Sequence, residues 1–202
     1  KLDNLSKKLD GPDIFMKRDD LTGLAFGGNK TRMMEFRLPP ALEKDADVIV
    51  TGFGVQSNHS RQIVAAARKF GLDIHLISRL TRKDEKVNIQ GNLLIDLLAG
   101  ATVDVVDVNH EEQARLVKEK AKELESSGRI PYITGYEDED LSAVSYVNCG
   151  VELQEQVQNE GISPDYVFLS SEGATQAGLL LFSNFVEASW DPIGINPVDW
   201  VD

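Results

Sequence analysis

A single lysine stands directly behind two glycines and an asparagine in the segment Phe26-Gly27-Gly28-Asn29-Lys30-Thr31-Arg32. This spacing predicts that Lys30 lies at the N-terminal end of a helix, with mobile backbone in front of it. A helix N-terminus and partial burial both disfavour the charged ammonium, so we expect the pKa of Lys30 to fall. A neutral lysine amine is a nucleophile whose usual partner is an aldehyde, such as that of pyridoxal phosphate. An ordinary glycine turn with a solvated lysine is equally compatible with this heptapeptide.

A second candidate site is the segment Gly52-Phe53-Gly54-Val55-Gln56-Ser57-Asn58-His59, which follows an apolar run and opens a predicted helix. Ligands of open α/β sheets bind beyond the carboxyl ends of the strands. Ser57 and Asn58 are either helix caps or, with free backbone N–H groups, a cradle for a substrate carboxylate. His59 either assists in binding or is satisfied within the helix, and the sequence favours the second interpretation.

A third candidate is the turn Ser170-Ser171-Glu172-Gly173-Ala174-Thr175-Gln176-Ala177-Gly178, which leads from a strand into the last predicted helix. Small residues at a helix N-terminus form a typical phosphate site. The competing interpretation is a plain strand-to-helix turn capped by Thr175. Glu172 favours that second interpretation, because a carboxylate repels a phosphate.

Composition excludes several other functions. The 202 residues carry 33 acidic and 21 basic side chains, and the net charge of −12 argues against nucleic acid as a partner. No apolar stretch is long enough to span a bilayer, no signal peptide is visible, and Cys149 is the only cysteine. We therefore expect a cytoplasmic protein without a membrane partner. A complete dinucleotide fingerprint, a metal-ligand cluster and a Gly-x-Ser-x-Gly elbow are all absent from the sequence.

Short β-branched runs alternate with longer helical patterns, which predicts an α/β fold with parallel sheets flanked by helices. The predicted strands are Ile14–Lys17, Asp47–Phe53, Ile74–Ser78, Val103–Val108, Tyr132–Thr134, Tyr166–Ser170 and Ile193–Asn196. The predicted helices are Asn58–Phe70, Val87–Leu98, Glu111–Ser126, Ser145–Asn159 and Thr175–Ala188, together with a helix from Lys30 to Lys44 that breaks at Pro39-Pro40.

Taken in order, the segments KRDDLTGLAFGGNKTR, QSNHSRQ, AAARKFGL, GNLLIDLLAGA and TQAG resemble D-cysteine desulfhydrase and 1-aminocyclopropane-1-carboxylate deaminase. These belong to the fold-type II (tryptophan synthase β-like) pyridoxal-phosphate enzymes. The resemblance implies a two-lobed fold: residues 1–43 begin the large cofactor-binding domain, residues 44–148 form the small α/β domain, and residues 149–202 continue the large domain. Because the family extends well beyond the last residues of this chain, we expect the large lobe to be incomplete here.

The resemblance also implies roles, with pyridoxal 5'-phosphate as the cofactor. Lys30 matches the lysine that binds the cofactor aldehyde, and Asn29 precedes it as in the family. Ser57 and Asn58 match residues that meet the substrate carboxylate and the cofactor ring, with His59 beside them, and Ser57 is a candidate catalytic hydroxyl. The family's phosphate turn corresponds to Gly173, Ala174 and Thr175. A small amino acid would yield a 2-oxo acid and ammonia, and the family suggests a homodimer.

At least three positions depart from the family pattern. Met33 stands where a basic residue near the phosphate is common, and Glu172 stands in a turn that is usually richer in glycine and serine. Both changes are expected to weaken phosphate binding. Phe182 also replaces a residue that is usually small. A catalytically impaired homologue that binds the cofactor or an amino acid weakly is therefore the alternative to an active deaminase or desulfhydrase. An unrelated nucleotide-binding module is disfavoured by the incomplete glycine fingerprint.

Overall fold

The fold is α/β, as predicted; the computed structural model describes residues 1–81, 87–135, 138–171 and 173–196. The helical elements are α1 (Asp3–Leu9), the 3-10 turns η1 (Asp19–Leu21) and η2 (Leu24–Phe26), α2 (Lys30–Arg37), α3 (Pro39–Glu43), α4 (Asn58–Lys69), α5 (Gly91–Leu98), α6 (His110–Ser126), α7 (Glu139–Asn159) and α8 (Ala174–Phe185). The strands are β1 (Val48–Gly54), β2 (Asp73–Arg79), β3 (Thr102–Val106), β4 (Pro131–Ile133), β5 (Tyr166–Leu169) and β6 (Asp191–Gly194).

The first four strands form one parallel sheet in the order β3-β2-β1-β4. Strand β1 is central and apolar on both faces. The consecutive residues Ile49 and Val50 point to opposite faces and belong to two different core clusters. The cluster around Ile49 includes residues of α2 and α4, whereas the cluster around Val50 includes Val117 of α6. The sheet is therefore covered on both faces, and its strand β1 ends at the turn that carries Ser57.

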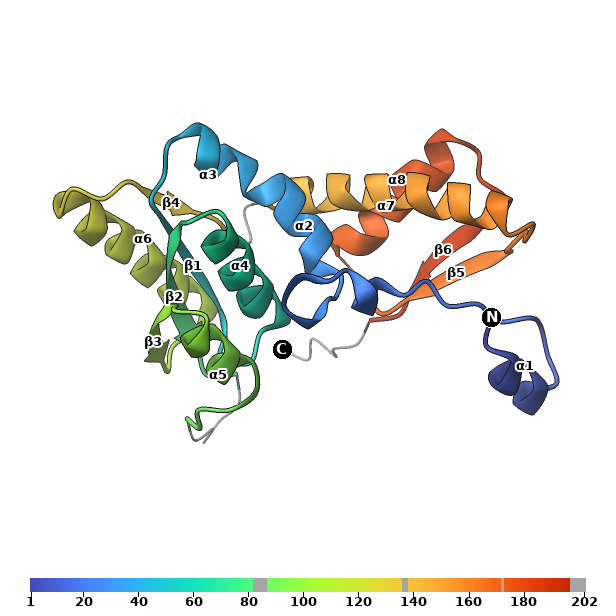
Figure 1. The fold of residues 1–202 in the computed structure, drawn as a ribbon, viewed down its shortest axis with the longest axis horizontal. Helices are drawn as coiled ribbons and strands as arrows, with labels where there is room; N and C mark the ends of the chain where they lie inside the picture. The colour runs from blue at the N-terminus through green and yellow to red at the C-terminus, as the bar shows by residue number, and fades with distance from the viewer. Residues whose placement is uncertain (82–86, 136–137, 172, 197–202) are drawn as a thin grey trace.

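Strands β5 and β6 pair in parallel as a second, two-stranded sheet against which α7 and α8 pack (Figure 1). The two helices approach closely because glycine stands at their crossing. A Cβ at Gly178 would overlap the Ala143 carbonyl oxygen, and a Cβ at Gly150 would overlap the Phe182 ring. Phe182 in turn stacks on Trp190 with ring centroids 6.1 Å apart. The large side chain at position 182 is thus accommodated by a glycine on the neighbouring helix.

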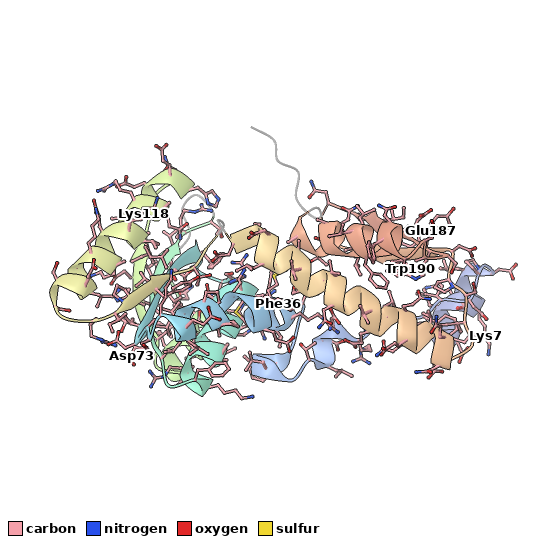
Figure 2. The ribbon with its side chains drawn as sticks, turned by 90° about the horizontal axis from the view of Figure 1, so that it is seen from above. Lys7, Phe36, Asp73, Lys118, Glu187 and Trp190 are labelled. Carbon is pink, nitrogen blue, oxygen red and sulfur yellow. The ribbon has the colours of Figure 1, made fainter. Side chains whose placement is uncertain are left out.

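Helix α2 lies between the two sheets and contacts both α4 and α7. In the view from above, Phe36 of α2 stands between Asp73 and Lys118 on one side and Trp190 and Glu187 on the other (Figure 2). The predicted break of this helix is confirmed: α2 ends at Arg37 and α3 begins at Pro39. The residue that begins α2 is Lys30, so the candidate nucleophile stands where the two lobes meet.

The predicted strand Ile14–Lys17 is wrong, because its polar groups bond to helices and pair with no strand among the described residues. The N–H of Ile14 donates to Ser6 Oγ at 2.9 Å, and the Ile14 carbonyl accepts from the N–H of Leu2 at 2.7 Å. Lys17 Nζ binds Glu152 of α7 at 2.7 Å. The segment therefore connects α1 to α7.

The assignment of the chain to two domains stays a prediction. The four-stranded sheet lies wholly within residues 44–148, as expected for the small domain. Helix α7, however, runs unbroken from Glu139 to Asn159 across the predicted boundary at residue 149. Among the described residues, no helix combines the length and apolarity needed to cross a membrane, and no cluster of three metal-ligating side chains occurs.

Candidate active site

Lys30 is the first residue of α2, with Asn29 at the N-cap position, as the glycine-rich segment predicts. The residue is half-buried. Loss of water around the ammonium lowers the pKa of Lys30, the nearby Arg37 charge lowers it further, and Glu139 opposes the shift. The direction agrees with the prediction, and burial is the largest cause. A lysine in this setting holds a larger neutral fraction near pH 8 than a solvated lysine does, which favours attack on an aldehyde.

Hydrogen bonds join the backbone in front of Lys30 to its neighbours, and its expected mobility stays a prediction. Gly28 N–H donates to the Asp19 carbonyl at 2.9 Å and to Thr22 Oγ at 3.0 Å. The Gly27 carbonyl accepts from Gln62 Nε2 at 2.7 Å. Both glycines have positive φ angles, +70° at Gly27 and +125° at Gly28. Glycine is needed here because the chain follows a conformation that other residues rarely adopt.

Ser57 caps α4. The sequence leaves two roles open for this residue, helix capping and ligand binding, and the structure shows the first. Its Oγ accepts from the N–H groups of His59 at 3.1 Å and Ser60 at 3.3 Å. A hydroxyl has two acceptor lone pairs and one donor hydrogen, so the donor of Ser57 remains for another partner. Asn58 is exposed, and its Oδ1 accepts from Asn92 Nδ2 at 2.9 Å. Capping therefore presents the Ser57 hydroxyl hydrogen and the Asn58 side chain at the carboxyl edge of the four-stranded sheet.

His59 lies beneath this turn and not on its surface. Its ring stacks on Phe53 with centroids 4.2 Å apart, and the residue is 5% exposed. Burial holds the pKa of His59 well below 6.5, and the charges of Arg37 and Lys30 act in the same direction. The sequence favours a histidine whose polar atoms are satisfied within the helix. The structure differs, because Nε2 of His59 is buried and has no hydrogen-bond partner among the described residues. Its assignment as a substrate ligand stays a prediction.

The third predicted segment begins α8. Gly173 is the N-cap and has no side chain to cap the helix, while Ala174 and Thr175 are buried in the first turn. N–H groups of a helix start have no partner within the helix and favour an anion. Asn29 Nδ2 lies 3.5 Å from Thr175 Oγ1, which places this turn next to the residue that precedes Lys30. The geometry thus brings the first and third segments together.

Met33 and Glu172 are the two departures that are expected to weaken phosphate binding. Met33 is 2% exposed and packs in the hydrophobic core with Met34 and Leu38. The side chain at position 33 is therefore part of the packing of α2 against its neighbours. Glu172 lies outside the described residues.

The structure shows a charged network close to Lys30 that the predicted site does not include. Arg32, two residues after Lys30, binds Asp19 at 2.9 Å and Glu152 of α7 at 2.7 Å. Tyr146 donates its hydroxyl to Asp19 at 2.8 Å. Asp19 thereby connects α2, α7 and the loop that holds Gly28. The run Lys17-Arg18-Asp19-Asp20 signals charge in the sequence, but only the fold shows which helices it joins.

The donor set fits pyridoxal phosphate in two respects. A half-buried lysine of lowered pKa suits the aldehyde, and an uncapped helix N-terminus beside Asn29 and Thr175 suits the phosphate. A polar turn that presents the Ser57 hydroxyl begins α4, whose Arg61 and Gln62 bind the Gly27 carbonyl. Fold and site together fit the class of lysine-dependent proteins that bind an aldehyde cofactor.

The amino-acid sequence matches the family described as pyridoxal-phosphate dependent enzyme over residues 1–200, and the chain belongs to this family. It is 38% identical over 185 residues to D-cysteine desulfhydrase of Serratia proteamaculans, covering 89% of this chain and 55% of that protein. It is 38% identical over 189 residues to 1-aminocyclopropane-1-carboxylate deaminase of Mesorhizobium japonicum, covering 90% and 56%.

The fold is likewise similar to a crystal structure described as an ACC deaminase homologue. The TM-score is 0.86 at 33% sequence identity, and the match covers 99% of this chain and 60% of that one. The chain thus spans a little over half the length of the curated relatives it matches. The predicted cofactor is confirmed at the level of the family.

Proposed function

We propose that the full-length protein containing this chain is a pyridoxal-phosphate-dependent lyase or deaminase acting on a small amino acid of the D-cysteine or 1-aminocyclopropane-1-carboxylate type. Its products would be a 2-oxo acid and ammonia. One observation carries the proposal: the Lys30 segment contacts the third predicted segment, through Asn29 to Thr175, and the helix that follows the second, through the Gly27 carbonyl to Gln62 and Arg61 of α4. The names of the relatives supply the substrate types.

Each residue of the candidate site has its own role in the proposed reaction. Lys30 would hold the cofactor aldehyde through its amine, and the same amine, when free, would be the base that moves a proton. Gly173, Ala174 and Thr175 offer the start of α8 to the phosphate. Ser57 donates its hydroxyl hydrogen to the substrate carboxylate, and Asn58 lies beside it. When bound, pyridoxal phosphate supplies the electron sink that withdraws charge from the substrate carbon.

The proposal is tested by adding pyridoxal phosphate to the full-length protein and recording the visible absorbance of a lysine-bound cofactor. Reduction with borohydride followed by peptide mapping is expected to place the label on Lys30. The label is lost in Lys30→Ala and kept in Lys69→Ala, whose side chain is exposed at the end of α4. An absence of absorbance in the folded parent protein would refute the proposal, and binding without turnover would identify an impaired homologue.

The two substrate types are separated by product analysis. Release of sulfide from D-cysteine indicates a desulfhydrase, and release of 2-oxobutanoate from 1-aminocyclopropane-1-carboxylate indicates a deaminase. Both assays use the same Lys30→Ala protein as the blank. Turnover of neither compound by a protein that binds the cofactor would remove both substrate assignments.

We also infer a homodimer in the cytoplasm. The family resemblance supports the dimer, and the single cysteine is compatible with a reducing compartment. Light scattering of the full-length protein measures the assembly, and a monomeric mass at micromolar concentration would contradict it. Cell fractionation measures the location.

A further inference from the structure

Arg61 of α4 contacts both halves of the candidate site. One guanidinium nitrogen donates to the Gly27 carbonyl at 3.3 Å and lies 3.5 Å from Asn58 Oδ1. The guanidinium carbon also stands 6.0 Å from the centroid of the Phe26 ring, in a cation–π arrangement. Arg61 therefore bridges the segment in front of Lys30 and the turn of Asn58. The position of its guanidinium sets the spacing between them.

Helix α5 supports this bridge with two residues one helical turn apart. Asn92 donates to Asn58 Oδ1, as described above, and Asp96 follows four residues later on the same face. Asp96 is 1% exposed. Its Oδ1 and the Nε of Arg61 are both buried, and neither has a hydrogen-bond partner among the described residues. Helices α4 and α5, which carry Arg61 and Asp96, pack against each other, and the charge of Arg61 favours the ionised form of Asp96.

Packing alone does not explain a carboxylic acid at this position. Burial raises the pKa of Asp96 to about 7, which means that the folded protein destabilises the charged form. A buried polar atom without a partner costs about 1–3 kcal/mol, and an asparagine would fill the same volume without a charge. A group that is costly to the fold and adjacent to a candidate site is a candidate for a functional role.

We propose that Asp96 and Arg61 are a pair of positioning residues for the cofactor site. The carboxylate of Asp96 attracts Arg61 and sets the place of its guanidinium. The guanidinium in turn holds the Gly27 carbonyl, three residues before Lys30, against the turn that carries Asn58. The cofactor part of this inference rests on the proposed function, whereas the coupling between α5 and the Gly27 segment does not.

The first test measures the dissociation constant of pyridoxal phosphate at pH 8 in the full-length protein. Asp96→Asn and Arg61→Gln are each expected to weaken binding about tenfold, which corresponds to about 1.4 kcal/mol of coupling. Because Asp96 acts through Arg61, the double variant is expected to bind no more weakly than Arg61→Gln alone. Multiplicative losses in the double variant, or parent-like binding by Asp96→Asn, would overturn the proposal.

A second arginine–aspartate pair, between the last turn of α4 and the start of β2, provides matched controls. Arg68 and Asp73 form an exposed ion pair at 2.6 Å, away from the candidate site. Arg68→Gln and Asp73→Asn are expected to keep the parent dissociation constant. Should Arg61→Gln fail to fold, Arg61→Lys keeps the charge with fewer donors and is expected to bind with intermediate affinity.

The second test needs no cofactor and is decisive if the proposed function fails. Amide hydrogen exchange of the segment 27–30 is measured in the cofactor-free full-length protein. Asp96→Asn and Arg61→Gln are expected to speed exchange of this segment while leaving α6 unchanged, and the Arg68 and Asp73 controls are expected to match the parent. Equal exchange in Asp96→Asn and the parent would overturn the coupling, whether or not the parent binds pyridoxal phosphate.

Discussion

At the residue scale, the position of Lys30 depends on two glycines that no other residue replaces without a clash. A Cβ at Gly27 would overlap the Asp20 carbonyl oxygen, and a Cβ at Gly28 would lie 2.6 Å from Gln62 Nε2. The Gln62 amide is the group that binds the Gly27 carbonyl. The two glycines therefore allow α4 to approach the segment before the lysine closely. They also allow the positive φ angles of that segment.

Gly28→Ala is expected to destabilise the fold by about 1–3 kcal/mol and to abolish labelling of Lys30 by pyridoxal phosphate, because the new methyl displaces the Gln62 amide. Gly71→Ala is the matched control. Gly71 also has a positive φ, +78°, but a Cβ there meets no atom within 4 Å. We expect it to cost about 1 kcal/mol and to leave the labelling intact. Urea unfolding and borohydride trapping measure the two effects, and equal labelling of both variants would contradict the argument.

The sequence predicts the residues of the site that stand next to glycines or at helix starts. Lys30, Ser57 and Thr175 are found in this way, because turns and caps leave a local pattern. Gln62, Arg61 and Asp96 are missed, since each lies inside a helix and looks like any polar residue on a helix face. Their positions relative to the Lys30 segment and to one another depend on how α2, α4 and α5 pack, and packing leaves no local signal.

At the scale of elements, a buried arginine fixes α2 against the start of α7. Arg37 is 1% exposed and donates to Ser142 Oγ at 2.7 Å and to the Gly135 carbonyl at 2.7 Å. It also pairs with Glu139 at 3.2 Å. Because its charge lowers the pKa of Lys30, the same residue connects the packing of the helices with the chemistry of the candidate site.

Arg37→Met is expected to lower the free energy of unfolding by about 1–3 kcal/mol, because a buried carbonyl and hydroxyl lose their donor. The pKa of Lys30 is expected to rise, since a neighbouring positive charge is removed. Urea unfolding measures the first effect, and the pH dependence of cofactor capture measures the second. Arg115→Met on the exposed face of α6 is the control and is expected to change neither quantity. A shift of the capture profile to lower pH would contradict the assignment.

The strength of the local pattern separates the elements that are predicted well from those that are not. Strand β1 and helix α4 are predicted within a residue or two, because buried runs and caps bound them on both sides. Helix α7 begins six residues earlier than predicted, at Glu139, where Asp138 accepts from Thr134 Oγ1 and the Gly135 N–H. Helix α1 is missed, since its start carries no capping side chain.

At the scale of the whole molecule, the candidate site lies where two sheets meet across α2 (Figure 1). The four-stranded sheet supplies the turn of Ser57 and Asn58, and the two-stranded sheet leads into the turn of Thr175. The alternation of strands and helices predicts each sheet, but no pattern in the sequence predicts the angle between them. The functional argument therefore depends on contacts such as Asn29 to Thr175, which only the fold reveals.

The pH dependence of global stability gives a test of the buried carboxyl group of Asp96. Its pKa rises from 3.8 to about 7 on folding, so between these values the folded protein keeps a proton that the unfolded chain releases. The contribution of Asp96 to the free energy of unfolding must then fall as the pH rises from about 4 to 7 and stay low above 7. At about 1.4 kcal/mol per pH unit, the contribution over the window is at most about 4 kcal/mol.

Asp96→Asn removes this contribution, so the variant is expected to gain stability relative to the parent as the pH rises from 5 to 8. The prediction concerns the difference between the two proteins, because the depressed pKa of His59 makes the stability of both rise with pH below about 6.5. Asp73→Asn is the control: the pKa of Asp73 is lowered by Arg129 and Arg68, so its contribution is constant above pH 5. Urea unfolding followed by circular dichroism at pH 5 and pH 8 measures the difference, and parallel profiles for Asp96→Asn and the parent would show that Asp96 titrates as a solvated acid. A variant that is more stable at pH 8 yet binds pyridoxal phosphate more weakly would separate the positioning role of Asp96 from a role in folding.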